Sequence, residues 1–324
     1  MPYPLLAFRA RLLKAVRNFF DDREFIEVQT PVLSADSVVD PYLEPVLVTD
    51  PLLPVNHHGT RRYFLQTSPE FAMKRLLVAG MAAIYQITPV FRAGDRGDFH
   101  NVEFTMLEWY RTGDSYTDGV NLLEALILHL LESLHTETVF SLRKNIDRFS
   151  YREIFETKTG FDPHRVSVDE LRQYAKSEQI PYPDSLHEKS GWLDLIFSER
   201  IQPELNAAIV YDYPAFDSQL AQERTVTDYA VSERFELFLN GVEMANGYHE
   251  LLDADLLQAR FSERAAIREQ NGSRPIPVAS RFLEAMRVGL PASCGVALGI
   301  DRLAMVLLGL PSIDLVLPFP LEEA

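Results

Sequence analysis

The sequence predicts an α+β fold in which an antiparallel sheet is flanked by helices. Apolar and polar side chains alternate toward the end of the stretch from Phe91 to Tyr110, as they do along a half-buried strand. The dipeptide Asn240-Gly241 separates two further alternating segments and is typical of a two-residue hairpin turn. A helix is expected at the start of the chain, from about Leu5 to Phe20.

The other elements follow from apolar periodicity and from proline content. The patterns predict helices over 115–135 and 253–271, and loops over the proline-rich stretches 41–54 and 181–184. We expect residues 1–324 to form a single domain with a helical insertion at about 115–205. Residues 137–205 carry no pattern to which chemistry can be assigned.

Composition narrows the class of protein. A chain of 324 residues with 47% hydrophobic content can bury one large core. A single cysteine excludes an internal disulfide, and no signal peptide or long apolar run is visible, so we expect a cytoplasmic protein without a membrane segment. The formal charge of −16 opposes indiscriminate nucleic-acid binding. No zinc site is expected, because metal-ligand spacing is absent among the histidines at 57, 58, 100, 164 and 249.

The stretch from Phe91 to Tyr110 also carries candidate chemistry. In a strand, Phe104, Glu108 and Tyr110 point to one face, so an aromatic ring, an acid and a phenol share one wall. The ring could stack on a purine, while the acid and the phenol could hold a cationic amine. Arg92 would bind phosphate, for which a guanidinium is well shaped. On spacing alone, a half-buried hairpin with a surface arginine is an equally good interpretation.

The predicted hairpin around Asn240-Gly241 brings two acids together. A two-residue loop places Phe238 opposite Glu243, so Glu236 lies diagonally across from Glu243 on the same face. Two carboxylates in that arrangement can share a divalent cation, and oxygen ligands beside phosphate favour magnesium. The alternative is an ordinary pair of acids on a solvated face.

Three more polar residues follow on the second strand of this hairpin. Asn246, Tyr248 and Glu250 have the opposite parity from Glu243. All of them can line one pocket only if the strand contains a bulge, which we expect near 245–247, where a glycine permits it.

The stretch from Cys294 to Gly309 predicts a glycine-containing apolar strand followed by a helix that begins near Asp301 and Arg302. It matches neither a Walker loop nor a dinucleotide-binding fingerprint. Gly295 and Gly299 would let a ligand lie against the backbone, with Arg302 at a helix start that favours anions. Cys294 is interpreted as a small packing residue rather than a nucleophile.

Together these three stretches resemble motifs 2 and 3, and the acidic hairpin between them, of the class II aminoacyl-tRNA synthetases of the lysine branch. FIEVQTPVLS after the first helix resembles motif 1, with Pro31 at its end, and implies a homodimer. The resemblance covers nearly the whole chain, and HNVEFTMLEWY is its most specific part. Motif 1 begins so early that no anticodon-binding domain is expected, which is similar to a short branch of the family that attaches (R)-β-lysine to a lysine of elongation factor P.

Two positions also resemble this short branch. Ser68 in QTSPEF and Ala297 in GVALG stand where lysyl-tRNA synthetases usually carry alanine and glycine. Both would line the amino-acid pocket, and a hydroxyl or a methyl group is the size of change that an amine moved by one carbon requires. Ser68 could equally cap a helix, and Ala297 could simply pack in its strand.

The resemblance implies a role for each site residue. Catalysis would depend on Arg92, Glu236, Glu243 and Arg302, with magnesium held by the two glutamates. ATP would contact Arg92, His100, Asn101, Phe104, Glu236, Leu237, Gly299 and Arg302. The amino acid, (R)-β-lysine or lysine, would contact Ser68, Glu70, Glu108, Tyr110, Glu243, Asn246, Tyr248, Glu250 and Ala297.

The activity implied by the resemblance is ATP-dependent formation of an acyl-adenylate, followed by transfer to a lysine of elongation factor P. tRNA is not the expected acceptor. Two alternatives stay open: a minimal ligase that charges tRNA with lysine, and a non-catalytic regulatory relative. Asp95 departs from the pattern of the tRNA ligases, where the acid stands one position earlier, and its role is left open.

Overall fold

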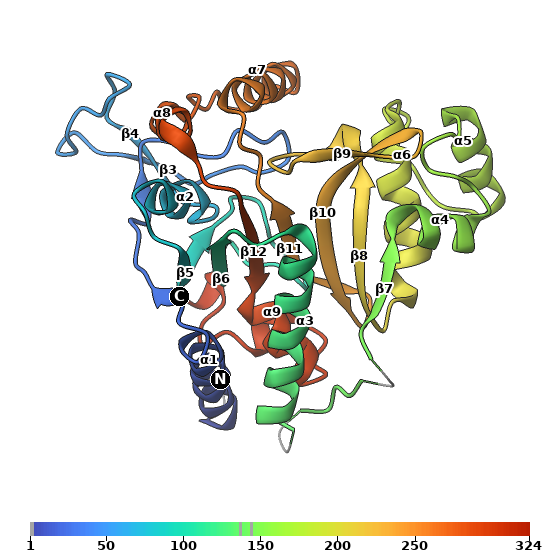
Figure 1. Ribbon diagram of the computed structural model, residues 1–324, viewed down its shortest axis with the longest axis horizontal. Helices are drawn as coiled ribbons and strands as arrows, with labels where there is room; N and C mark the ends of the chain where they lie inside the picture. Colours follow the sequence, from blue (N-terminus) through green and yellow to red (C-terminus); the bar gives the residue numbers. More distant parts are fainter. Residues whose placement is uncertain (1–2, 136–137, 143–144) are drawn as a thin grey trace. The chain divides into compact units, whose positions relative to one another are not determined.

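The computed structural model describes residues 3–135, 138–142 and 145–324, so the predicted insertion is described except at 136–137 and 143–144. The chain divides into two compact units (Figure 1). Unit 1 comprises Met1–Phe140 and Glu250–Ala324, and unit 2 comprises Ser141–His249. In the part of the chain that is described, no helix is both long and apolar enough to cross a membrane.

Unit 1 is built on strands in the order β1-β5-β6-β12. β5 pairs with β6, and β6 with β12, in antiparallel fashion, whereas the short β1 runs parallel to β5. A smaller antiparallel sheet has the order β2-β4-β3. The strands of unit 1 are β1 (Ile26–Glu27), β2 (Leu33–Ser34), β3 (Leu47–Thr49), β4 (Arg62–Leu65), β5 (Ala83–Phe91), β6 (Glu103–Thr112) and β12 (Ser293–Gly299).

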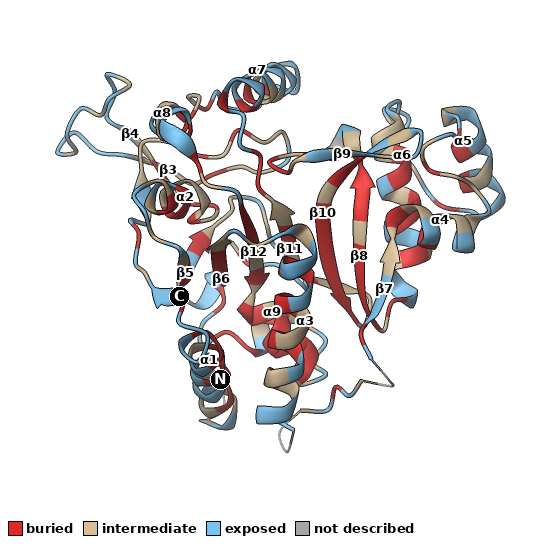
Figure 2. Cartoon of the chain, viewed as in Figure 1, coloured by how far each residue is buried: buried red, intermediate tan, exposed pale blue. Residues whose placement is uncertain are grey.

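The helices of unit 1 pack through apolar faces, some on these strands and others, such as α7 and α8, on neighbouring helices. They are α1 (Tyr3–Asp21), α2 (Glu70–Val78), α3 (Tyr116–Ser133), α7 (Ala254–Gln270), α8 (Ser280–Gly289) and α9 (Ile300–Leu307), with short 3-10 turns at Ile313–Leu315 and Leu321–Glu323. α1 is anchored by Phe20, whose ring stacks on Tyr85 of β5 with centroids 4.7 Å apart. The most deeply buried part is β12 followed by α9, drawn largely in red in Figure 2.

Unit 2 has its own strands in the order β11-β10-β8-β7, with β9 on the edge of β10. β7 and β8 run parallel and the other pairs are antiparallel. The strands are β7 (Asp147–Ser150), β8 (Ala207–Pro214), β9 (Glu223–Val226), β10 (Tyr229–Leu239) and β11 (Val242–His249). The helices are α4 (Tyr151–Thr159), α5 (Val168–Ser177) and α6 (Lys189–Ile196), followed by a π turn at Phe197–Ile201 and 3-10 turns at Gln202–Glu204 and Ala215–Asp217.

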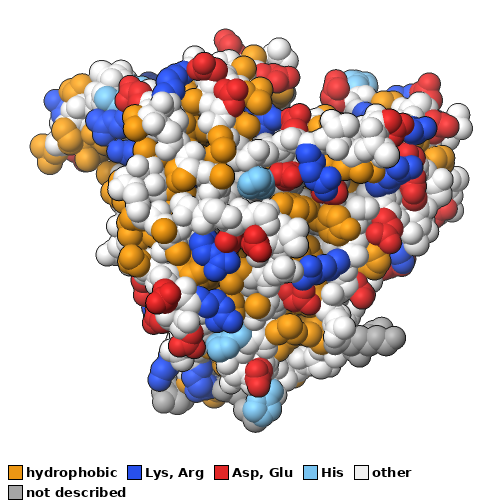
Figure 3. Space-filling view, in the orientation of Figure 1, with side chains coloured by type: hydrophobic (Ala, Val, Ile, Leu, Met, Phe, Trp, Pro, Cys, Tyr) orange, Lys and Arg blue, Asp and Glu red, His pale blue; other side chains and the backbone are white. Residues whose placement is uncertain are grey.

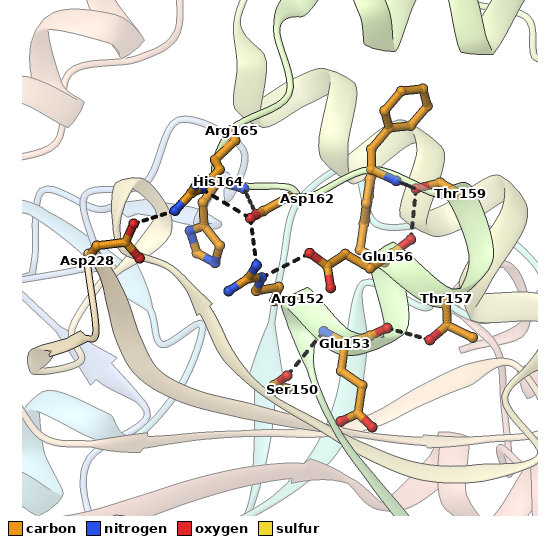
Figure 4. Close-up of polar contacts among 12 residues, drawn as sticks. Ser150, Arg152, Glu153, Glu156, Thr157, Thr159, Asp162, His164, Arg165 and Asp228 are labelled. Atoms are coloured by element: carbon orange, nitrogen blue, oxygen red, sulfur yellow. Dashed lines mark hydrogen bonds and ion pairs between the residues drawn. The ribbon is translucent and has the colours of Figure 1, made fainter.

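The helices of unit 2 enclose a core around Trp192, Phe155 and Phe238. Local polar contacts fix the start of this helical segment (Figure 4). Ser150 caps α4 by accepting a hydrogen bond from the amide of Glu153, and Arg152 forms an ion pair with Asp162 at 3.0 Å. In the face drawn in Figure 3, acidic and basic side chains are interspersed.

The structure confirms the main expected elements and corrects two details. α1, α3 and α7 match the three predicted helices, and the alternating stretches are strands β6, β10 and β11. The stretch 41–54 is not entirely loop, because it contains β3, which pairs with β4. The hairpin bulge exists but lies earlier than expected: Ala245 is opposite Leu237 while Glu243 is opposite Phe238, so Met244 is the extra residue.

Candidate functional site

In unit 1, Glu108 on β6 forms the centre of a buried polar cluster. Its side chain is 1% exposed. One carboxylate oxygen accepts a hydrogen bond from the Ser68 hydroxyl at 2.7 Å, and the other accepts one from the Tyr110 hydroxyl at 2.6 Å. Ser68 also accepts a hydrogen bond from the amide of Glu70 at 3.0 Å, although Pro69 occupies the N-cap position of α2. Ser68 therefore both orders the start of α2 and contacts the predicted amine-binding acid.

The same cluster contains a cation that the sequence did not suggest, Lys74 on α2. Its side chain is 1% exposed, and its ammonium lies 2.5 Å from a carboxylate oxygen of Glu70 and 2.5 Å from one of Glu250. Both carboxylates were expected to meet the amines of a substrate. We call Ser68, Glu70, Lys74, Glu108, Tyr110 and Glu250 the amine cluster.

The amine cluster has more acid than Lys74 can neutralise. Burial, followed by the charge of Glu70, raises the pKa of Glu108 to about 7. Burial raises the pKa of Glu250 to about 8, because it outweighs the attraction of Lys74. Burial alone would lower the pKa of Lys74, but the charges of Glu250 and Glu70 reverse the direction and raise it. An additional ammonium group bound here would be stabilised by the excess of carboxylates.

Strand β12 provides the neighbouring wall of the amine cluster. Ala297 pairs directly with Glu108, and Gly295 pairs with Tyr110. A Cβ atom at Gly295 would lie 2.1 Å from the ring of Tyr110 and 2.5 Å from a carboxylate oxygen of Glu250. We had expected this glycine to make room for a ligand against the backbone. Within unit 1, it makes room for two side chains of the amine cluster.

We expect Gly295→Ala to displace Tyr110 and Glu250. The change should destabilise the protein by about 1–3 kcal/mol, as overpacking in a buried site usually does, and should weaken binding of the amino acid. Chemical denaturation and amino-acid-dependent exchange of pyrophosphate into ATP measure the two effects. Gly97→Ala is a control for stability, because its Cβ would have no atom within 4 Å. Equal stability of the two variants would contradict the packing role of Gly295.

Four of the predicted nucleotide-binding residues of unit 1 lie on β6 or in the connection that leads to it from β5: Arg92, His100, Asn101 and Phe104. The guanidinium carbon of Arg92 lies 5.2 Å from the centre of the Phe104 ring, so the predicted phosphate-binding and adenine-stacking residues are neighbours. His100 forms a bridge with Gly97 in the connecting loop. Asn101 is buried, and its amide group donates to the carbonyl of Glu103 at 2.7 Å and accepts from the amide of Leu321. Its side chain therefore holds the loop.

The start of α9 is fixed by an ion pair. Gly299 is its N-cap residue, and Arg302 in the first turn donates to the carbonyl of Phe99 at 3.3 Å. The preceding residue, Asp301, is 1% exposed and pairs with Arg9 of α1. Asp301 also accepts a hydrogen bond from the amide of Thr105 at 2.6 Å. This network connects α1, β6 and α9.

In unit 2, Glu236 on β10 is the centre of a second buried cluster. One of its carboxylate oxygens accepts from the Tyr213 hydroxyl at 2.6 Å. The other accepts from Arg234 and, at 3.2 Å, from the side-chain amide of Asn246. Asn246 is directly opposite Glu236 because of the bulge at Met244. The carbonyl oxygen of the Asn246 side chain is buried and has no hydrogen-bond partner among the described residues.

The electrostatics of Glu236 suit a cation. Burial raises its pKa to about 7; Arg234 counteracts the rise and the charge of Glu243 adds to it. The oxygen that binds Tyr213 retains one acceptor position, so the carboxylate can still serve as a metal ligand. A divalent cation would relieve the repulsion between Glu236 and Glu243, and these oxygen donors fit magnesium.

The other predicted residues of unit 2 lie on the same hairpin. The hydroxyl of Tyr248 donates a hydrogen bond to the side-chain oxygen of Gln219 at 2.5 Å. Leu237 is fully buried, with 0% exposure, so its side chain packs in the interior.

Sequence reasoning missed Lys74, Arg234, Tyr213 and the pair of Arg9 with Asp301. Signals were present for two of them. Lys74 follows Glu70 by four residues on a helix, and Arg234 precedes Glu236 by two residues on a strand, so each shares a face with a predicted site acid. Tyr213 and Arg9 are distant in the sequence from their partners, and no local pattern identifies them.

Comparison with known proteins gives a consistent picture. The profile of the family described as tRNA synthetases class II (D, K and N) matches residues 3–323. A protein named elongation factor P–(R)-β-lysine ligase from Photobacterium profundum is 38% identical over 320 residues, which cover 98% of this chain and 95% of that protein. A protein of the same name from Enterobacter sp. (strain 638) is 37% identical, and the alignment covers 99% of this chain and 96% of that protein. A third, from Vibrio atlanticus, is 38% identical, with 98% of this chain and 95% of that protein covered.

Proposed function

The chain belongs to the class II tRNA synthetase family of the D, K and N type, and from this membership we propose that it activates (R)-β-lysine with ATP and transfers it to a lysine side chain of elongation factor P. The observation that carries the proposal is the amine cluster of unit 1. Buried carboxylates whose pKa values are raised to about 7 and about 8 favour a ligand that brings an additional ammonium group.

The proposed reaction has two steps. A carboxylate oxygen of the amino acid attacks the α-phosphorus of ATP, the bond to the β-phosphate oxygen breaks, and pyrophosphate leaves. The amine of the acceptor lysine then attacks the carbonyl carbon of the acyl-adenylate, loses a proton and displaces AMP. Arg92 would stabilise the charge on the α-phosphate and Arg302 the charge on the γ-phosphate, so catalysis comes from positioning and charge neutralisation.

The residues of unit 2 would serve the metal and the substrate. We propose that Glu236 and Glu243 hold magnesium, which would neutralise the charge of the phosphates when bound. Arg234 and Tyr213 keep the Glu236 carboxylate in place through their hydrogen bonds. Asn246 would offer its unpartnered carbonyl oxygen to the substrate.

The preference for the β isomer would depend on Ser68 and Ala297. Ser68 already donates to Glu108, and Ala297 pairs with Glu108 across the strands, so both border the acid that is proposed to bind an amine. A shift of the amine by one carbon requires a matching shift of polar and apolar groups around it.

Exchange of labelled pyrophosphate into ATP tests the proposal, run separately with (R)-β-lysine and with lysine. We expect faster exchange with (R)-β-lysine, and a gain of one β-lysyl mass on elongation factor P when the acceptor is added. Absence of exchange with either isomer would indicate a non-catalytic relative. Charging of lysine tRNA without modification of elongation factor P would indicate a tRNA ligase. Either outcome removes the proposal.

The proposal includes action in the cytoplasm, as expected for modification of a translation factor.

We also propose a homodimer formed through motif 1. Two apolar residues of this motif are exposed in the single chain: Ile26 is 55% exposed and Leu33 is 37% exposed. Apolar groups of this kind gain stability when a partner covers them. We expect Ile26→Asp to shift the dimer toward monomer, measured by light scattering during size-exclusion chromatography. Val288→Asp is a control, since Val288 is 81% exposed and lies outside motif 1. A monomeric wild type would contradict the dimer.

A further inference from the structure

Two adjacent histidines converge on one aspartate in unit 1. The Nε2 atom of His57 lies 3.0 Å from Oδ1 of Asp36, and the Nε2 atom of His58 lies 2.6 Å from the same oxygen. The two imidazole rings are 4.0 Å apart between their centres. One ligand atom from each residue falls within 4.8 Å of the other two. No role is assigned to these residues by the activity described above. The sequence analysis expected no zinc site because it compared the spacing of the histidines alone, whereas the fold brings the distant Asp36 beside His57 and His58.

The loop that carries the histidines is held in this shape by Asn56. The Asn56 side chain accepts from the amide of His58 at 3.0 Å and donates to the carbonyl of Arg62 at 2.6 Å. Its backbone amide donates to the carbonyl of Thr60 at 2.7 Å. The segment that carries the aspartate is held separately, because the backbone amide of Asp36 donates to the hydroxyl of Ser34 at 3.1 Å. The histidine loop and the Asp36 segment are therefore each fixed by contacts that do not involve the histidine rings.

We propose that Asp36, His57 and His58 bind a divalent transition-metal ion, with zinc as the best match. Two imidazoles and one carboxylate form a donor set typical of zinc sites that keep a position open for another ligand. At zinc–nitrogen distances of about 2.0–2.1 Å, tetrahedral ligand atoms are separated by roughly 3.3 Å. The observed separations of 3.0 and 2.6 Å to Asp36 require only a small opening of the group.

An ion bound by these three residues would lie beside a cavity that reaches the amine cluster. Asp36 and His57 line a cavity of about 350 Å³ that is also lined by Ser68, Arg75 and Arg281. Ser68 contacts Glu108 directly. A metal ion would join the loop at 51–60 to the segment after β2 and would fix one wall of this cavity. It would act by ordering the wall, and the two-step reaction proposed above does not require it.

The main test is binding of Zn²⁺ to the full-length chain after treatment with a chelator. Equilibrium dialysis should show one Zn²⁺ per chain that is lost in His57→Gln, His58→Gln and Asp36→Asn. His187→Gln is the matched control, because His187 is an exposed histidine of unit 2, and it should bind as the wild type does. Co²⁺ in place of Zn²⁺ should give the visible absorption of a four-coordinate site in the wild type, and this absorption should vanish in the same three variants.

A second readout does not depend on activity. Arg61 and Arg62 are exposed beside the loop, so trypsin can cleave there. We expect Zn²⁺ to slow this cleavage at least fivefold in the wild type and in His187→Gln, and to leave the rate unchanged in His58→Gln. Binding of Zn²⁺ that survives all three substitutions, or a wild type without Zn²⁺ and without protection, would overturn the proposal. Those outcomes would leave the histidines as hydrogen-bond partners of Asp36.

Discussion

Glu108→Gln is expected to lower kcat/KM for (R)-β-lysine by about 10- to 150-fold while leaving the protein at least as stable. The glutamine can keep hydrogen bonds to Ser68 and Tyr110, whose hydroxyls lie 2.7 and 2.6 Å from the carboxylate. It cannot provide the charge that pairs with an ammonium group. Loss of a hydrogen bond to a charged partner costs about 1.5–3 kcal/mol, and 1.36 kcal/mol corresponds to a factor of ten.

The stability of this variant follows from the sign of the pKa shift. The pKa of Glu108 is raised from 4.5 to about 7 in the folded protein, mainly by burial. The folded state therefore favours the neutral acid, and ionisation above pH 7 costs up to about 3 kcal/mol of stability. Glutamine does not ionise, so the free energy of unfolding of the variant should exceed that of the wild type at pH 8. The difference should shrink as the pH falls toward 4.5.

The same shift predicts the pH dependence of catalysis. Pairing with the substrate ammonium requires the carboxylate, so kcat/KM of the wild type should fall as the pH drops below about 7. In Glu108→Gln the fall of kcat/KM near pH 7 should be absent. The remaining fall with decreasing pH should be centred near pH 8 and should reflect protonation of Glu250, whose pKa is about 8. Glu263→Gln, on an exposed position of α7, is a suitable control. A variant of normal kcat/KM, or one with an unchanged pH profile, would contradict the role of Glu108.

Local patterns were sufficient to predict that Glu108 and Tyr110 lie side by side on one strand. Side chains alternate with a period of two in any strand, so placing Glu108 and Tyr110 on one face required only that β6 be a strand. The hairpin was predictable for a similar reason: Asn240 and Gly241 both adopt positive φ, 48° and 74°, as a tight two-residue turn requires.

The structural features that were missed depend on tertiary packing. A bulge can occur at several positions of a strand, and only the pairing of β10 with β11 places it at Met244. Asp36 and His57 are 21 residues apart, and no periodicity relates them. A Glu–Lys pair spaced by four residues is usually exposed, so Glu70 and Lys74 gave no sign of burial in the sequence.

Burial of Lys74 leads to a large expected effect on stability. Lys74→Met keeps the aliphatic part of the side chain and removes the ammonium that pairs with Glu70 and Glu250 at 2.5 Å. The Glu250 carboxylate then lies 1% exposed without this cation. Loss of one partner of a buried ion pair typically costs about 3–5 kcal/mol, and we expect a loss of this size at pH 8.5.

The loss should depend on pH in a defined direction. The pKa of Glu250 is already about 8 with Lys74 present, and removal of a neighbouring cation raises it further. The folded variant therefore binds a proton on Glu250 at pH values where the unfolded chain, with a pKa near the ordinary 4.5, has released it. At pH 5.5 and 7 Glu250 holds this proton in both folded proteins, so the stability deficit should change little between these two values. It should grow above about pH 8, where only the wild type releases the proton and gains the pairing of the carboxylate with Lys74.

Urea denaturation of the wild type and Lys74→Met at pH 5.5, 7 and 8.5 measures this dependence. Lys176→Met, which removes an exposed lysine of α5, should change stability by less than about 0.5 kcal/mol at each pH. The double variant Lys74→Met with Glu250→Gln removes both charges and should recover part of the loss at pH 8.5. A deficit that is the same at all three pH values would show that Lys74 contributes through packing, and the excess negative charge assigned to the amine cluster would then have no basis.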